Sequence, residues 1–213
     1  LFLDELPEFR RDALEALRQP IEEGRVTITR SMTTVTFPAA FMLVASMNPC
    51  PCGNLGHPAK ECRCAPSAIR RYLARVSGPL MDRIDIQVHV APPDLDALDG
   101  PPPEDDTDRV RERVRLARAL QERRLGASGA RTNARLPART VLETARAASP
   151  AMALLKRAVA ELGLSARAFH KVLRIARTVA DLAGDGPVEA AHVAEAVQYR
   201  GLDRRGGAGF ITD

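Results

Sequence analysis

The chain has 213 residues, of which 45% are hydrophobic and 27% charged, and its formal net charge is +4. This length suffices for one large or two small domains, and no apolar run approaches the roughly 20 residues of a membrane span, so we expect no membrane contact. The basic balance permits nucleic-acid binding, while an aromatic share of 4% without tryptophan argues against a base-stacking platform for single strands.

The chain opens on a short apolar run that ends in two acids, Leu1-Phe2-Leu3-Asp4-Glu5. Such a run predicts a buried parallel strand that delivers two carboxylates to the edge of a sheet. In nucleotide-hydrolysing P-loop proteins, a strand of this kind places one acid on Mg²⁺ and the next beside the attacking water. The same pattern also occurs at helix starts and in surface turns.

A helix and a hairpin are predicted next. Residues 8–18 carry apolar side chains at helical spacing, and Pro20 and Gly24 are expected to end this helix. Two alternating runs between Val26 and Phe37 then predict a β-hairpin.

The apolar run 41–48 predicts another strand, which ends at Asn48. Buried strands that flank a helix and a hairpin fit an α/β sheet with crossover connections. Ligands of such sheets bind where the strands end, and an amide at that place can orient a water beside a γ-phosphate. The alternative is that Asn48 and Pro49 simply form a turn.

Four cysteines follow as Cys-x-Cys, nine residues, Cys-x-Cys. Four thiolates can close a tetrahedral shell around Zn²⁺ with no position left for water, which favours a structural over a catalytic site. Reduced thiols without metal are one alternative, and disulfides, which a cytosolic protein disfavours, are another. Gly53 and Gly56 would let the backbone fold around the ion, and His57 is expected to be a loop residue. The predicted ligands are Cys50, Cys52, Cys62 and Cys64.

Arg83 lies just before a third predicted strand. Ser67 is expected to open a short helix, and the alternating run 86–90 predicts the strand. A guanidinium that reaches a phosphate stabilises the transition state of phosphoryl transfer. The alternative is a local ion pair with Asp82 or Asp85.

A proline-rich and acidic stretch divides the chain. Residues 93–106 have little to bury and are predicted to form a linker. They separate an α/β domain at 1–92 from a helical domain at 107–205, and a tail follows at 206–213.

Helical periodicity governs the second half, which we expect to be a small all-α bundle. Ser165 can cap one of its helices, and Arg167 lies in the first turn of that helix. The first helix is expected to turn one face inward, made of Val110, Val114, Ala117 and Leu120. The helices are expected to begin near Thr107, Ala138, Pro150, Ser165 and Pro187.

Several motifs stand in an informative order: Leu-Phe-Leu-Asp-Glu, the hairpin, Asn-Pro-Cys-Pro-Cys-Gly, Gly-Pro-Leu-Met-Asp-Arg-Ile-Asp and Leu-Ser-Ala-Arg-Ala-Phe-His-Lys-Val-Leu-Arg. Together they cover nearly the whole chain. The chain resembles the magnesium-chelatase-like AAA+ ATPases of the YifB/ComM family. The resemblance implies an α/β fold, namely part of a P-loop AAA+ core whose parallel sheet carries a β-hairpin insertion, followed by an all-α lid bundle.

The resemblance also implies roles for single residues in binding ATP and Mg²⁺. Asp4 would hold Mg²⁺ through water, and Glu5 would activate or orient the attacking water. Asn48 would be the sensor at the end of its strand. Arg83 would be a finger offered to the ATP of the adjacent subunit, and Arg167 would be a second sensor on the lid.

The hairpin would project toward the pore of a hexameric ring and contact DNA. It supplies Arg25 and Arg30 as candidate phosphate contacts. The family resemblance implies a cytoplasmic helicase that drives branch migration of DNA.

The sequence departs from the family in one respect: it contains no Gly-x-x-x-x-Gly-Lys-Ser/Thr. That loop cradles the phosphates of ATP. We therefore expect this stretch of chain, taken by itself, neither to bind ATP tightly nor to hydrolyse it.

The sequence is compatible with three functions. The first is a DNA-translocating ATPase, in which hydrolysis moves the hairpins along DNA. The second is the motor subunit of a metal chelatase, which remodels partner subunits so that Mg²⁺ enters a tetrapyrrole. In the third, residues 107–205 form an interaction module without a nucleotide role.

Overall fold

The structure is a computed structural model that describes residues 1–31, 33–91, 107–126, 130–184 and 186–200. The chain divides into two compact units, with the boundary between Ile84 and Asp85. The predicted linker 93–106 and the tail 206–213 lie outside the described residues. Within the described ranges, no helix combines the length and the apolar character that crossing a membrane requires.

The first unit contains a two-stranded parallel sheet. Strand β1 (Phe2–Leu3) pairs with β4 (Val44–Ala45), and Phe2 stands opposite Val44. The strand predicted over 41–48 is therefore much shorter than expected. The prediction that the opening strand is buried is also wrong, since Phe2 is 64% exposed. A parallel strand is buried only when neighbouring strands and covering helices enclose it, and within the described chain β1 has β4 as its single neighbour.

Three short helical segments replace the single helix predicted over 8–18. They are η1 (Leu6–Glu8), α1 (Arg11–Ala16) and α2 (Arg18–Glu23). Pro20 does not end the helix, because it lies in the first turn of α2, where a missing N–H costs no intrahelical hydrogen bond. Gly24 ends α2 with a φ of +67°, as its lack of a side chain allows.

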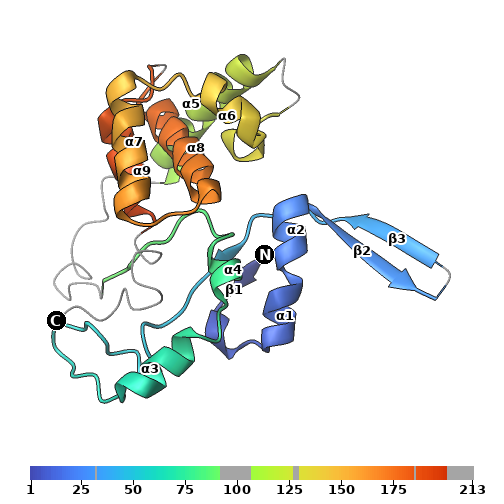
Figure 1. The fold of residues 1–213 in the computed structure, drawn as a ribbon, viewed down its shortest axis with the longest axis vertical. Coiled ribbons are helices and arrows are strands. Elements are labelled where there is room, and N and C mark those ends of the chain that lie inside the picture. Colours follow the sequence, from blue (N-terminus) through green and yellow to red (C-terminus); the bar gives the residue numbers. More distant parts are fainter. Residues whose placement is uncertain (32, 92–106, 127–129, 185, 201–213) are drawn as a thin grey trace. The chain divides into compact units, whose positions relative to one another are not determined.

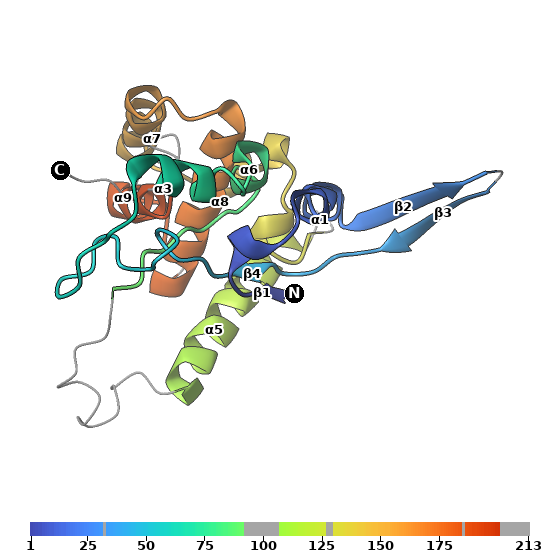
Figure 2. The same ribbon diagram turned by 90° about the horizontal axis from the view of Figure 1, so that it is seen from below.

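The hairpin is confirmed, and in Figures 1 and 2 it extends away from α2 as an arm. Strands β2 (Arg25–Arg30) and β3 (Thr33–Pro38) pair antiparallel over six residues each. One face carries threonines, with hydroxyl contacts of 3.1 Å between Thr27 and Thr36 and 3.2 Å between Thr29 and Thr34. The alternate residues form the other face, which is apolar: Val26, Ile28, Val35 and Phe37.

Two further helices occur among the described residues of the first unit, and Leu80 of the second helix joins Leu14 of α1 in a buried cluster. Helix α3 (Pro66–Leu73) lies close to the predicted start, and Ser77 caps α4 (Gly78–Met81) by accepting a hydrogen bond from the Leu80 N–H. A small apolar core ties the start of the unit to its end. Its buried members are Leu6, Leu14, Val76 and Leu80.

The second unit is the predicted helical bundle. A single apolar core, centred on α8, runs through it, and Ser165 caps α8 as expected, since its hydroxyl accepts from the Ala168 N–H. The helices are α5 (Thr107–Leu125), η3 (Asn133–Arg135), α6 (Ala138–Thr144), α7 (Ser149–Glu161), α8 (Ala166–Ala183) and α9 (Ala190–Gln198).

Two predictions for this unit are wrong. In α5 the buried side chains are Ala117, Gln121 and Leu125, while Val110 and Val114 are exposed. Residues 86–90 form no strand; the Gln87 N–H instead donates to the Tyr199 carbonyl at 2.8 Å. An alternating pattern becomes a strand only where another strand accepts its ladder of hydrogen bonds.

A buried polar network joins α5, η3 and α8 around Asp181. Both carboxylate oxygens of Asp181 accept from Arg124, each at 2.7 Å, and one accepts from the Asn133 amide at 2.8 Å. The Arg177 guanidinium lies 2.9 Å from the same carboxylate. The side chain of Asp181 is fully enclosed, so these partners replace the water that it loses on folding.

Candidate functional site

The carboxyl ends of β1 and β4 bring predicted site residues together. The Ser46 hydroxyl donates to Asp4, and the Asp4 carboxylate also accepts from the Glu5 N–H at 3.0 Å. Parallel pairing places these residues at one sheet edge, since the Ser46 N–H donates to the Leu3 carbonyl at 3.0 Å and the Leu6 N–H donates to the Ser46 carbonyl at 2.9 Å. Both acids are exposed. The arrangement suits an edge at which a hydrated cation binds.

Glu5 has a backbone conformation that is unusual for its residue type. Its φ is +51° and its ψ is +49°, in the left-handed region, immediately before η1. Non-glycine residues adopt this conformation infrequently, and such strain gathers at functional sites.

Asn48 lies two residues beyond Ser46 and is held from two sides. A Cβ atom built on Gly53 would come within 3.8 Å of the Asn48 side-chain oxygen, so this amide packs against the cysteine loop. On the other side lies Tyr72 of α3, where burial raises the pKa of the phenol against an opposing hydrogen bond from the Asn48 backbone. The Asn48 side chain therefore lies beside the cysteine loop.

Arg83 forms an ion pair within its own unit. Its guanidinium lies 2.5 Å from the Glu22 carboxylate and donates to the Pro79 carbonyl at 2.8 Å. The Arg83 side chain is 15% exposed, and its Nε is buried without a hydrogen-bond partner in the described part of the chain. A carboxylate 61 residues away in sequence thus competes with any phosphate for this arginine.

The four cysteines converge on one point. Their sulfur atoms all lie within 4.8 Å of one another, and the Cys50 sulfur is 3.4 Å from that of Cys52 and 3.6 Å from that of Cys62. Four sulfurs placed 2.3 Å from a tetrahedral Zn²⁺ would be about 3.8 Å apart. No disulfide joins these residues. The donor set and its spacing fit a zinc ion.

The thiols differ in acidity because they share one site. Hydrogen bonds from the Asn54 backbone, Cys50 and Cys64 lower the pKa of Cys52 to about 6. The hydrogen bond with Cys52, together with burial, raises the pKa of Cys64 to about 12. Without a cation, only part of such a cluster ionises near neutral pH.

The loop backbone follows the sequence prediction. Gly53 and Gly56 have φ values of +78° and +79°, which side chains rarely tolerate. His57 is a loop residue, since its Nδ1 accepts from the Ala59 and Lys60 N–H groups at 3.0 and 3.1 Å. It therefore lies outside the ligand cluster.

Comparison with known proteins decides the family. The family model described as "Magnesium chelatase, subunit ChlI" matches residues 1–98, and the model of the ChlI C-terminal region matches residues 104–200. The protein "Competence protein ComM" of Haemophilus influenzae is 40% identical over 205 residues. The chain belongs to the YifB/ComM family of magnesium-chelatase-like proteins.

Two further relatives match over nearly the same length. "Uncharacterized protein YifB" of Escherichia coli is 38% identical over 205 residues, and an uncharacterized Mycobacterium tuberculosis protein is 40% identical over 203 residues. The alignments cover 96% of this chain for ComM and YifB and 94% for the mycobacterial protein. In each case the chain spans 39% of the length of the relative.

The remaining site residues predicted from family resemblance lie elsewhere. Arg25 is at the base of the hairpin, 3.1 Å from the Glu23 carboxylate, and Arg30 is exposed at the far end of β2. Arg167 is exposed in the first turn of α8, in the helical unit. Sequence reasoning missed Ser46 and Glu22. Ser46 could have been found, because it lies at the end of the same predicted strand as Asn48, whereas Glu22 carries no local signal.

Proposed function

We propose that this chain is part of an AAA+ ATPase that hydrolyses ATP with Mg²⁺ in the cytoplasm and uses the energy to move along DNA as a hexameric ring. The observation that carries the proposal is the acidic edge of the β1–β4 sheet, where Asp4 and Glu5 follow β1 and Ser46 follows β4, with Asn48 two residues further along the chain. Family membership supports the ATPase part, and the name of the competence relative supports a role with DNA.

In this proposal each residue acts on a different part of the reaction. Asp4, supported by Ser46, would hold Mg²⁺ through water, and the bound ion would supply positive charge beside the phosphates. Glu5 takes the proton of the attacking water or orients it, and Asn48 fixes that water beside the γ-phosphate. Arg83 leaves Glu22 and reaches the ATP of the neighbouring subunit, where it stabilises the developing charge. Arg167 contacts the nucleotide from the lid.

Replacing Glu5 by glutamine in the full-length protein is expected to lower ATP hydrolysis by at least about a hundredfold, as loss of a general base does. Binding of a fluorescent ATP analogue should change little, because the amide keeps the size of the side chain. Asp12→Asn is the matched control, since Asp12 is an exposed carboxylate of the same unit, paired with Arg10. Equal hydrolysis by the Glu5 variant and wild type would remove Glu5 from the mechanism.

The hairpin is proposed to contact phosphates of DNA. Arg25→Ala with Arg30→Ala in the full-length protein is expected to weaken binding of a labelled forked DNA at least tenfold at 0.1 M salt, because each lost phosphate contact gives up close to one decade. A charge-matched control replaces Arg10 and Arg70, exposed arginines of the same unit outside the hairpin. Unchanged binding after loss of both hairpin arginines would refute this contact.

A chelatase motor is the second candidate, because the matching family models describe magnesium-chelatase subunits. The two candidates differ in their response to DNA. ATP hydrolysis by a DNA translocase rises when DNA is added, whereas a chelatase motor has no reason to respond. Measuring the ATPase rate of the full-length protein with and without forked DNA separates them.

A further inference from the structure

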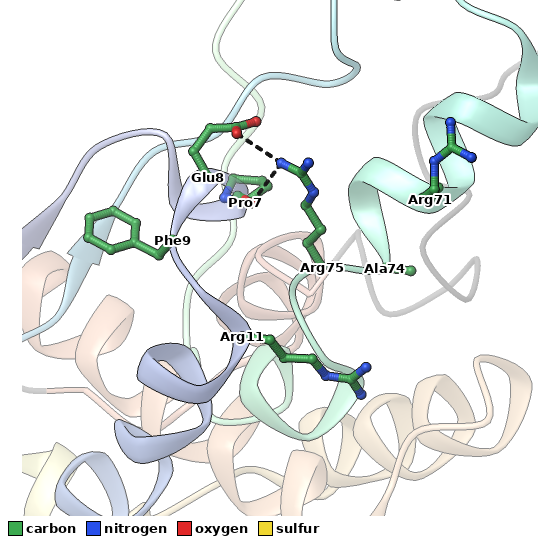
Figure 3. Close-up of a pocket in the computed structure, with 7 residues that line it drawn as sticks. All are labelled: Pro7, Glu8, Phe9, Arg11, Arg71, Ala74 and Arg75. Atoms are coloured by element: carbon green, nitrogen blue, oxygen red, sulfur yellow. Dashed lines mark hydrogen bonds and ion pairs between the residues drawn. The ribbon is translucent and has the colours of Figure 1, made fainter.

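A basic groove lies between the start of α1 and the end of α3. Its volume is about 540 Å³, within the range of binding sites for small ligands or ligand segments. Figure 3 shows the side chains around it, which come from the η1–α1 connection and from α3. The lining residues are Pro7, Glu8, Phe9, Arg11, Arg71, Ala74 and Arg75.

One of the three arginines is fixed and neutralised. Arg75 donates to the Glu8 carboxylate at 2.8 Å and to the Pro7 carbonyl at 3.2 Å. This bridge joins the η1 turn to the residue just beyond α3, so it shapes the groove. We assign Arg75 a structural role and do not count its charge toward a ligand.

The other two arginines form no direct ion pair, although the charge of Arg11 acts on Glu15, four residues further along α1. Neither Arg11 nor Arg71 forms an ion pair with any residue that the structure describes, and both are exposed. In Figure 3 their guanidinium groups turn away from the Glu8 carboxylate, whereas that of Arg75 turns toward it. The groove therefore presents two guanidinium groups on separate helices, and these attract anionic groups.

We propose that this groove holds the phosphodiester backbone of a single nucleic-acid strand, as a second contact besides the hairpin. The proposal rests on the DNA-binding part of the proposed function. The groove is open, so a polymer can continue past it, and two guanidinium forks suit phosphate oxygens. The apolar lining is confined to Pro7, Phe9 and Ala74, which offers little to anchor a peptide. Such a contact positions the strand without reading its bases.

The test compares two double variants of the full-length protein. Arg11→Gln with Arg71→Gln removes the two unpaired charges of the groove, while Arg10→Gln with Arg70→Gln removes the same charge from the adjacent positions, which do not line it. The probe is a fluorescent oligothymidylate of about 20 nucleotides, and the readout is anisotropy over a salt series. The groove variant should bind roughly 25-fold more weakly at 0.1 M salt, with a salt slope about 1.4 less steep, since each single-strand contact contributes about 0.7.

The possible outcomes distinguish the proposed groove contact from the hairpin contact and from DNA binding as a whole. Equal losses in the two double variants would overturn the proposal, because the effect would then be net charge alone. A loss in the hairpin variant but none in the groove variant would overturn it while leaving the proposed function standing. Absence of DNA binding by wild-type protein would refute the proposed function itself. A poly-glutamate that binds as tightly as the oligonucleotide, and loses the same affinity in the groove variant, would overturn the phosphodiester assignment.

Discussion

Replacing Asp181 by alanine is expected to lower the free energy of unfolding of the helical unit by about 3–5 kcal/mol, the usual cost of removing one partner from a buried ion pair. The change leaves Arg124 and Arg177 enclosed without their shared carboxylate. It also removes an acceptor of the Asn133 amide. Urea unfolding followed by far-UV circular dichroism measures the loss, because most of the helical signal comes from this bundle.

A matched control is Glu112→Ala in α5. Glu112 also pairs with an arginine, Arg115, at 2.7 Å, but both side chains are more than half exposed, so solvent screens the pair and we expect no measurable change. A second comparison measures the cost of leaving the buried Arg124 charge without its carboxylate partner. Adding Arg124→Met to Asp181→Ala should restore part of the lost stability, because it removes a buried cation that has lost its partner. Equal stabilities of the Asp181 and Glu112 variants would show that the network contributes little.

Local patterns predicted the parts of the fold that local interactions decide. The alternation between Val26 and Phe37 gave the hairpin, because two strands joined by a short turn pair with each other. The Ser165 cap was likewise predictable, since its hydroxyl bonds to a backbone group three residues away. The cysteine cluster falls in the same class, because its ligands lie within one short loop.

Partners distant in sequence were not predictable. Asp181 meets Arg124 across 57 residues, and Arg83 meets Glu22 across 61. In a chain with 31 basic and 27 acidic residues, periodicity does not select which charges meet. The α5 prediction failed for a related reason, since apolar spacing places Val110 inward only where a neighbouring helix covers that turn.

In the candidate site, too, local sequence patterns were informative, whereas contacts between residues distant in sequence were not predicted. Asp4, Glu5 and Asn48 were proposed from the ends of predicted strands, and the parallel pairing of β1 with β4 brings the ends of both strands to one edge. The finger role of Arg83 stays a prediction, and the structure adds that Glu22 must release it first.

Purified protein is expected to carry about one zinc ion per chain, held by the four cysteine thiolates. Three of the sulfur–sulfur distances, 3.4, 3.6 and 3.7 Å, lie close to the value of about 3.8 Å for a tetrahedral thiolate shell. Cys62→Ser should lose most of the zinc, because a hydroxyl does not replace a thiolate ligand. His57→Ala should keep it, since the His57 ring bonds to the loop backbone instead. Elemental analysis of protein expressed in zinc-supplemented medium measures both.

Zinc loss should also open the loop, because binding free energy at a structural site is folding free energy. Lys60 and Arg63 lie inside the loop, so trypsin reports its order directly. Cleavage after these residues should be slow in wild type and in His57→Ala, and fast in Cys62→Ser or after chelation. Absence of zinc from wild-type protein would reject the site and leave reduced thiols without metal as the interpretation.

The cysteine loop lies beside Asn48, so we expect zinc loss to affect this residue. Cys50 follows Asn48 by two residues, and the Gly53 backbone packs on the Asn48 amide. Tyr72 lies against the Asn48 backbone, and the chain has only one other tyrosine, Tyr199, and no tryptophan. In a Tyr199→Phe background, chelation should therefore change the tyrosine fluorescence, and it should lower kcat for ATP more than it raises KM. If complete zinc removal left the fluorescence unchanged, the position of Asn48 would not depend on the metal ion, and this prediction would be wrong.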